Sequence, residues 1–194
     1  MVSVAAKAST LGKSARNPWL GLAVLLSAVF MTILDVFIVV VAAPAIRADV
    51  GASMAQIQWV VAAYSLGMAV FIMSAATLAD LQGRRRWYVA GIVVFTLASV
   101  ACGLAPTLEL LNVARGVQGV AAATANVTSL ALVSAAFPDP GQKARAIGIW
   151  TAIASVGTAI GPTLGGFLVE QLGWRSIFLV NVPVGIVAVV AGWY

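Results

Sequence analysis

Residues 146–169 read AIGIWTAIASVGTAIGPTLGGFLV, a run of 24 residues without a single charged side chain. A helix needs about 20 apolar residues to cross the hydrocarbon core of a bilayer, so this run is long enough to span a membrane. Five further apolar runs fill most of the remaining chain. Together they predict six transmembrane helices, at about 19–42, 57–79, 87–104, 108–136, 146–169 and 177–194.

The spans are predicted to be helices rather than strands. In lipid every backbone polar group must be satisfied internally, which leaves only helices and closed barrels. Barrel strands alternate between apolar and polar residues, whereas residues 91–95 read GIVVF. We therefore predict an all-α integral membrane bundle over residues 19–194, preceded by a cytoplasmic N-terminal tail over residues 1–18.

The composition supports a membrane protein and excludes several other classes. Of the 194 residues, 62% are apolar and only 9% are charged, whereas soluble domains are about 25% charged. A single cysteine, Cys102, rules out an intrachain disulfide, and the absence of histidine rules out His-based metal sites. No nucleophile–base pair stands out, so we expect neither an enzyme nor a bound metal or cofactor.

The positive charges predict the orientation of the chain in the membrane. Cytoplasmic loops carry an excess of Lys and Arg. One set of alternate loops contains only Arg47 and Arg175, whereas the other set holds Lys7, Lys13, Arg16, Arg84, Arg85, Arg86, Lys143 and Arg145. We therefore expect a multi-pass protein of the plasma membrane with both termini in the cytoplasm. On this interpretation the net charge of +5 reflects orientation and not nucleic-acid binding.

The N-terminus allows a second interpretation. A cleaved signal peptide would explain Lys and Arg before an apolar run, but the first run exceeds the 7–15 residues of a typical signal h-region. We therefore expect a retained first helix that ends near Pro44, Asp49 and Gly51.

Two charged residues lie inside predicted spans. Asp35 and Arg115 each fall about seven residues from the outer end of their span, roughly 10 Å below the outer surface. A charge in the hydrocarbon costs several kcal/mol and is a functional candidate by default. We expect the two side chains to face each other across a polar cavity as an ion pair or proton relay. The alternative is that each extends separately to the membrane surface.

Glycines recur on one face of the fifth span. Gly157, Gly161 and Gly165 follow one another every four residues, with Pro162 and Gly166 beside them. Small residues at this spacing let two helix backbones approach closely, and proline removes a helix hydrogen bond. The pattern predicts either simple tight packing or a packed face with a hinge.

The turn between the second and third spans brings opposite charges together. Asp80 lies at the C-terminus of a helix, where the helix dipole disfavours an anion, so it needs a cationic or N–H partner. Gly83 permits a tight turn that would bring Arg84 or Arg85 back towards it. A solvated basic loop is the alternative.

Five of these segments resemble motifs of the major facilitator superfamily. Residues 76–86, ATLADLQGRRR, resemble its loop between helices two and three, and residues 111–119, LNVARGVQG, its helix-four motif. Residues 157–166, GTAIGPTLGG, are similar to its antiporter motif in helix five. The resemblance to the fourteen-helix drug:proton antiporters rests on residues 34–44, LDVFIVVVAAP, and residues 174–183, WRSIFLVNVP. Departures from the motifs fall at Ala76, Leu81, Phe37 and Val40.

The resemblance implies a role for each motif. Asp35 would be the proton-coupling residue, and Arg115 would tune it within a helix-four motif that also includes Gln118 and Gly119. The gating loop on the cytoplasmic side would comprise Asp80, Gly83, Arg84 and Arg85. The helix-five antiporter motif would comprise Gly157, Gly161, Pro162, Gly165 and Gly166.

The resemblance also implies a fold and a function. Six helices would form two inverted three-helix repeats, which is half of a transporter whose two halves enclose a central cavity. We therefore expect the N-terminal half of a proton-coupled multidrug efflux transporter that works by alternating access. Its partners would be the lipid bilayer, protons, hydrophobic or cationic small molecules and a missing C-terminal half. The alternative is a truncated, transport-inactive or homodimerising structural membrane protein.

Overall fold

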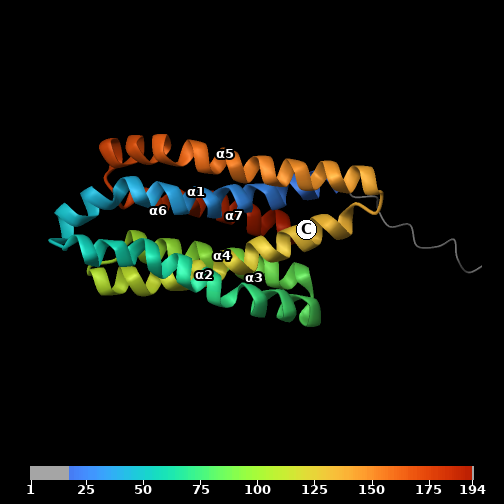
Figure 1. The fold of residues 1–194 in the computed structure, drawn as a ribbon, viewed down its shortest axis with the longest axis horizontal. Coiled ribbons are helices and arrows are strands. Elements are labelled where there is room, and N and C mark those ends of the chain that lie inside the picture. The colour runs from blue at the N-terminus through green and yellow to red at the C-terminus, as the bar shows by residue number, and fades with distance from the viewer. Residues whose placement is uncertain (1–17, 194) are drawn as a thin grey trace, which may run out of the picture.

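The computed structural model describes residues 18–193. The predicted N-terminal tail, with Lys7, Lys13 and Arg16, therefore lies outside the described residues except for Pro18. The described part of the chain is helical throughout, apart from short connections (Figure 1). Its helices are α1 (Pro18–Val50), α2 (Met54–Gln82), α3 (Arg84–Gly103), α4 (Leu108–Ala136), α5 (Pro140–Leu172), α6 (Ser176–Leu179) and α7 (Asn181–Trp193).

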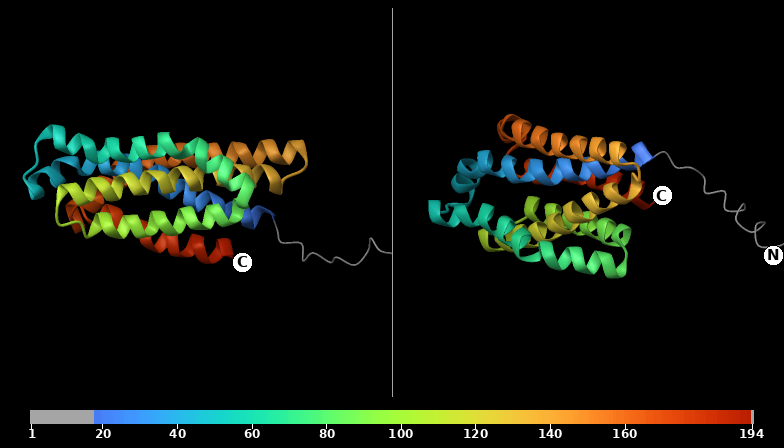
Figure 2. Two further views of the ribbon diagram at one scale, coloured as in Figure 1. Left: turned by 90° about the horizontal axis from the view of Figure 1, so that it is seen from below. Right: turned by 45° about the vertical axis from the view of Figure 1, so that its right-hand side comes forward.

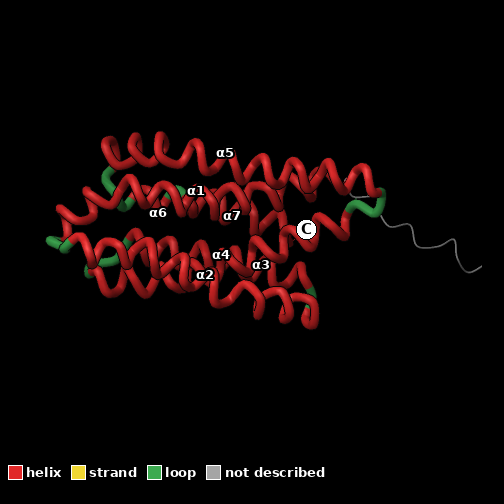
Figure 3. Tube along the Cα trace, in the orientation of Figure 1, coloured by secondary structure: helices red, strands yellow, loops and turns green. Residues whose placement is uncertain are grey.

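The helices lie side by side along the long axis of the molecule (Figures 1 and 2). Helices α2 and α3 both pack extensively on α4, and α1 packs along α5. Helix α7 joins the two groups because it contacts both α3 and α1. The connections gather at the two ends of the bundle (Figure 3). We call them the Gly51 end, with the turns after α1, α3 and α5, and the Gly83 end, with those after α2 and α4.

Helices α1 to α5 are long and apolar enough to cross a membrane, with 20 to 33 residues each. The sixth apolar segment, Ser176–Gly192, is shorter. The predicted all-α membrane bundle is therefore confirmed, as five long helices and one shorter helical segment.

Side chains and one glycine define the helix ends. Ser53 caps α2 by accepting a hydrogen bond from the Gln56 N–H at 3.3 Å, and the Gln56 side chain accepts one from the Ser53 N–H at 2.9 Å. Asp139 caps α5 by accepting from the Gln142 N–H at 2.8 Å. Between α2 and α3 the chain reverses at Gly83, where φ is 106°, a conformation that other residues rarely adopt.

The predicted helix break at Pro44 is wrong, because α1 continues through Pro44 to Val50. Proline removes one helix hydrogen bond, but the helix on both sides of it is anchored in the core. Ala42 and Ile46 are both completely buried. Packing of this kind supplies most of the stability of helices in proteins, and α1 ends at Val50, just before Gly51.

The sixth span differs from a single helix over residues 177–194. It is interrupted at Val180, which separates α6 from α7. Pro183 has no N–H to donate, and its ring would clash with the Leu179 carbonyl in a continuous helix. The chain therefore restarts at Asn181, which places Pro183 in the first turn of α7, where proline is tolerated.

Candidate functional site

Asp35 of α1 and Arg115 of α4 meet in the middle of the bundle. Both side chains are completely buried, and Arg115 Nη1 donates to Asp35 Oδ2 in an ion pair. The sequence predicted an ion pair or proton relay across a polar cavity. The structure shows the ion pair, as a direct contact with no cavity between the two side chains.

Because the two side chains are in contact, they lie at the same level of the bundle, although at different distances from the ends of their helices. Arg115 lies seven residues from the start of α4, about 10 Å along the helix, whereas Asp35 lies 15 residues from the end of α1, about 22 Å. They meet nevertheless, because α1 extends further than α4 at the Gly51 end (Figure 1).

Two amides complete the surroundings of the Asp35 carboxylate. Oδ1 accepts hydrogen bonds from Gln118 Nε2 at 3.1 Å and from Asn181 Nδ2 at 2.8 Å. Gln118 Nε2 also donates to Ser99 Oγ at 2.8 Å. These residues come from α1, α3, α4 and α7, so the hydrogen-bond network around the buried carboxylate connects four helices.

The Arg115 guanidinium is held by both polar and aromatic groups. Its Nε donates to the Val60 carbonyl at 3.1 Å, and its Nη1 donates to Gln118 Oε1 at 2.7 Å. The guanidinium carbon lies 4.3 Å from the centre of the Tyr64 ring and 5.7 Å from that of Phe178. Its Nη2 is buried and has no hydrogen-bond partner among the residues that the structure describes.

This arrangement places an ionisable group where its charge state matters. A buried charge is stable only while it is paired, and removing one partner typically costs about 3–5 kcal/mol. Protonation of Asp35 would leave Arg115 without its counter-ion. The site can therefore connect the uptake of a proton to a rearrangement of the helices that supply its residues.

Sequence reasoning singled out Asp35, Arg115 and Gln118 but missed other members of this site. The sequence assigns no role to Ser99 or Tyr64, and Asn181 enters only as part of the motif at residues 174–183. For Ser99 and Asn181 a signal existed, because both are polar residues inside apolar runs.

The helix-five glycines pack against α1. A Cβ atom added to Gly161 would lie 2.8 Å from Phe37 Cβ, and one added to Gly165 would lie 2.7 Å from Ile38 Cγ1. At Gly157 the corresponding distance, to Ile33 Cγ2, is 3.3 Å. Gly166 lies at the edge of this contact, with Val41 Cγ1 of α1 4.0 Å from an added Cβ, and Pro162 is exposed. The stripe thus lies at a close contact between α1 and α5.

Helix four uses glycine in the same way against α2. A Cβ on Gly119 would collide with the Tyr64 carbonyl oxygen, and one on Gly67 would collide with the Gly116 carbonyl oxygen. These backbone contacts bring α2 close enough for Val60 and Tyr64 to reach Arg115.

At the Gly83 end the structure brings part of the predicted gating loop together. Arg84 Nε lies 2.7 Å from Asp80 Oδ1 in an exposed ion pair. Arg85 points elsewhere, and its Nε donates to the Gly192 carbonyl of α7 at 2.9 Å. The sequence predicted Arg84 or Arg85 as the partner of Asp80, and the structure shows Arg84 in that role.

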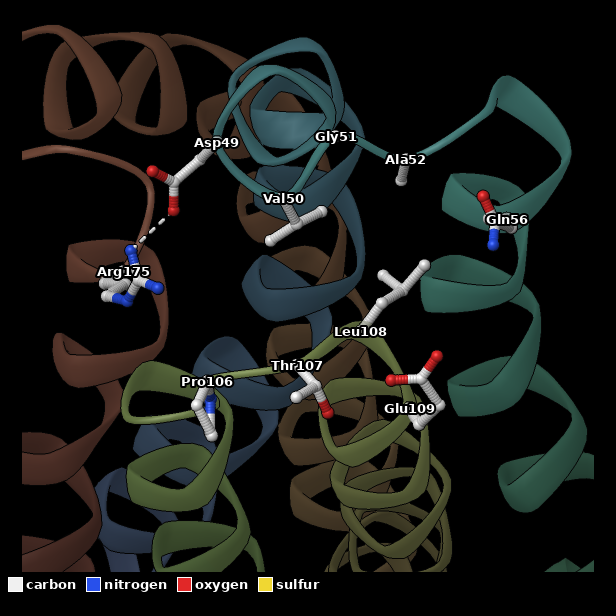
Figure 4. Close-up of a pocket in the computed structure, with 10 residues that line it drawn as sticks. All are labelled: Asp49, Val50, Gly51, Ala52, Gln56, Pro106, Thr107, Leu108, Glu109 and Arg175. Carbon is white, nitrogen blue, oxygen red and sulfur yellow. Dashed lines mark hydrogen bonds and ion pairs between the residues drawn. The ribbon is translucent and has the colours of Figure 1, made fainter.

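A pocket of about 420 Å³ opens at the Gly51 end (Figure 4). Arg175 Nη1 lies 2.8 Å from Asp49 Oδ2 on one side, where Trp174 Nε1 also donates to Asp49. Gln56 of α2 and Glu109 of α4 lie on the other side (Figure 4). Nothing in the sequence pointed to this pocket.

Within residues 18–193, no group of three His, Cys, Asp or Glu side chains is placed to hold a metal ion.

Comparison with known proteins gives consistent matches. A family model described as Major Facilitator Superfamily matches residues 25–194. Multidrug resistance protein Stp of Mycobacterium tuberculosis is 67% identical over 156 residues, covering 80% of this chain and 29% of Stp. Drug efflux pump JefA of the same species is 51% identical over 157 residues, covering 81% of this chain and 31% of JefA.

A solved structure shares the fold. It is the crystal structure of a bacterial homolog to the human lysosomal transporter Spinster, in an inward-facing and unoccupied conformation. The TM-score is 0.73 at 21% identity, and the match covers 92% of this chain and 42% of the other. The chain spans about 30% of the length of the curated relatives named above.

Proposed function

Because this chain belongs to the Major Facilitator Superfamily, a family of membrane transporters and not of enzymes, we propose that it forms the N-terminal half of a proton-coupled multidrug efflux transporter. The transporter would work by alternating access and exchange protons for drug molecules. Its relatives Stp and JefA are named as a multidrug resistance protein and a drug efflux pump.

The observation that carries this proposal is the buried ion pair of Asp35 and Arg115. Charged residues inside the membrane are costly and mark ion pathways or proton relays. We assign Asp35 as the group that takes up and releases the proton. Arg115 is its counter-ion, and Gln118 and Asn181 orient the carboxylate through their amide donors.

The other motifs have supporting roles in this proposal. The Asp80–Arg84 ion pair and the Arg85 bond to α7 hold the loop at the Gly83 end, which closes or opens the cytoplasmic gate. Gly157, Gly161 and Gly165 hold α1, which carries Asp35, firmly against α5. The substrates are hydrophobic or cationic small molecules.

We place the protein in the plasma membrane with both termini in the cytoplasm. Among the described residues, the Gly83 end carries Arg84, Arg85, Arg86, Lys143 and Arg145, whereas the Gly51 end carries Arg47 and Arg175. Positive residues concentrate on the cytoplasmic side of membrane proteins. The Gly83 end is therefore cytoplasmic, and the Gly51 end faces outward.

A C-terminal half is the proposed partner of this bundle. Helices α2 and α5 are its least buried spans, and they expose large apolar side chains such as Val70 and Met73 of α2 and Ile160 and Phe167 of α5. These surfaces suit a second half as well as lipid. The central cavity would then lie between the two halves.

The test is Asp35→Asn in the complete transporter. The amide is nearly isosteric with the carboxylate and its oxygen still accepts from Arg115, but the buried guanidinium loses its counter-ion. Folding of the purified variant is therefore checked first by size-exclusion chromatography. Export of a fluorescent drug by everted vesicles should no longer respond to an imposed pH gradient. The matched control, Glu170→Gln, changes an exposed carboxylate near the end of α5 and should export normally. Gradient-dependent export by Asp35→Asn would contradict the proposal.

A further inference from the structure

The pocket at the Gly51 end lies directly above the buried ion pair along α4. Glu109 lines the pocket (Figure 4). Asn112 and Arg115 follow it along α4 at intervals of three residues. Residues three apart on a helix are neighbours on its surface. At 1.5 Å per residue, Arg115 is only about 9 Å along the helix from Glu109.

Helix α2 also runs from the pocket to the ion pair. Gln56 lines the pocket opposite Glu109, and four residues further on, the Val60 carbonyl accepts the hydrogen bond from Arg115 Nε. One helical turn of α2 thus also leads from the pocket to the ion pair. The segment in between is bounded by α2 and α4.

Two buried polar atoms on this course have no partner. Asn112 Oδ1 is an acceptor and Arg115 Nη2 is a donor, and neither makes a hydrogen bond with any residue that the structure describes. Buried polar groups are otherwise almost always satisfied, by protein or by ordered water. A donor and an acceptor on adjacent turns are suitable partners for a bridging water molecule, because a buried water typically makes two to four hydrogen bonds.

We propose that this pocket is the entrance through which water from outside reaches the Asp35–Arg115 pair, by way of Asn112. The ligand is water together with the proton that it carries. In the loading step a hydronium ion gives its proton to the Asp35 carboxylate, which leaves one water molecule and a neutral carboxylic acid, while Arg115 keeps its own protons. The route lies inside this half, between α2 and α4, and is separate from a drug cavity between two halves. The inference rests on the proposed proton coupling and names its entry side.

The first test measures water access and needs no transport. In a Cys102→Ala background of the complete transporter, Asn112→Cys is treated from outside with a membrane-impermeant cationic methanethiosulfonate. The matched control is Leu97→Cys on α3, which is 64% exposed on the surface of the bundle and lines no part of the pocket. We expect labelling of Cys at position 112, unaffected by excess drug, and no labelling at position 97. Equal labelling at both positions, or protection of position 112 by the drug, would overturn the route.

The second test measures proton movement. Asn112→Leu replaces the polar side chain with an apolar one of similar size, whereas Asn112→Ser keeps a polar group. Proton uptake by the purified complete protein after a rapid drop in pH should slow about tenfold in the Leu variant, which corresponds to about 1.4 kcal/mol in the barrier. The Ser variant should take up protons at the normal rate, and both should bind the drug with unchanged affinity.

The outcomes separate this inference from the proposed function. An unchanged uptake rate in Asn112→Leu would overturn the route and leave the role of Asp35 intact. If the unsubstituted protein released no protons on binding drug, proton coupling itself would be contradicted, whereas labelling at position 112 would still establish the water path.

Discussion

At the scale of single residues, Asn181 shows how a polar side chain becomes part of a charged site. It begins α7 after the interruption at Val180, and its amide donates to Asp35 Oδ1 at 2.8 Å. A hydrogen bond to a charged group contributes about 1.5–3 kcal/mol. We expect Asn181→Leu to lower the melting temperature of the purified transporter by several degrees. Gln171→Leu, at an exposed position near the end of α5, should leave it unchanged, and equal shifts would contradict this role.

The sequence predicted the charged members of the site and missed most of the uncharged ones. Asp35 and Arg115 are conspicuous because charges are rare inside apolar spans. Ser99 and Asn181 cost far less in a membrane, so their presence alone does not indicate a site. Tyr64 is a common residue in any helix, and only its placement beneath Arg115 gives it a role.

At the scale of elements, the contact between α1 and α5 depends on glycine. A leucine at Gly161 would place its Cβ within 2.8 Å of Phe37 Cβ and push the helices apart. Overpacking of this kind costs about 1–3 kcal/mol. We expect Gly161→Leu to reduce the amount of folded transporter in size-exclusion profiles. The control is Gly148→Leu on the same helix, where an added Cβ meets nothing within 4 Å. Full export and expression by Gly161→Leu would show that the stripe faces lipid.

The contact between α2 and α4 leaves even less space for a side chain than the contact between α1 and α5. A Cβ on Gly119 would collide with the Tyr64 carbonyl oxygen, and backbone cannot move aside as a flexible side chain can. Even Gly119→Ala should therefore disturb the Arg115 site, seen as a loss of gradient-dependent export larger than that of Gly148→Ala. Similar activity of the two variants would contradict the close contact.

The hydropathy of the sequence predicted which segments form helices, but it did not predict where those helices end. Apolar runs predict where a chain can cross a membrane, yet they do not show how far a helix continues beyond it. Proline usually ends helices, so the sequence predicts a stop at Pro44, but buried neighbours on both sides override that preference. In the sixth span the same residue type at Pro183 did interrupt the helix. The difference depends on tertiary packing, which local sequence does not contain.

At the scale of the whole molecule, the orientation can be tested with two cysteines. In the Cys102→Ala background of the complete transporter, Thr107→Cys at the Gly51 end should react with an impermeant thiol reagent added to intact cells. Gln142→Cys at the Gly83 end should react only after the membrane is opened. Both positions are exposed beside short connections, so a reversed pattern would overturn the positive-inside assignment.

The arrangement of the helices was less predictable than their number. Hydropathy cannot reveal that α2 and α3 pack on α4 while α1 packs along α5. Those neighbours are chosen by glycine contacts and by the buried ion pair, which join residues far apart in the sequence. The family resemblance supplied an expected arrangement, and the residues alone did not.

The separation of the ion pair along the chain has a consequence for biosynthesis. Asp35 precedes Arg115 by 80 residues and Asn181 by 146. At about 5–20 residues per second, a ribosome needs roughly 4–16 s to reach Arg115 and roughly 7–29 s to reach Asn181. During that interval the newborn first helix carries a carboxylate whose partners have not yet been translated. The first helix must therefore remain beside the aqueous translocon or enter the lipid with Asp35 as the neutral acid. The binding site of the Asp35 carboxylate is complete only after the last helix has been inserted.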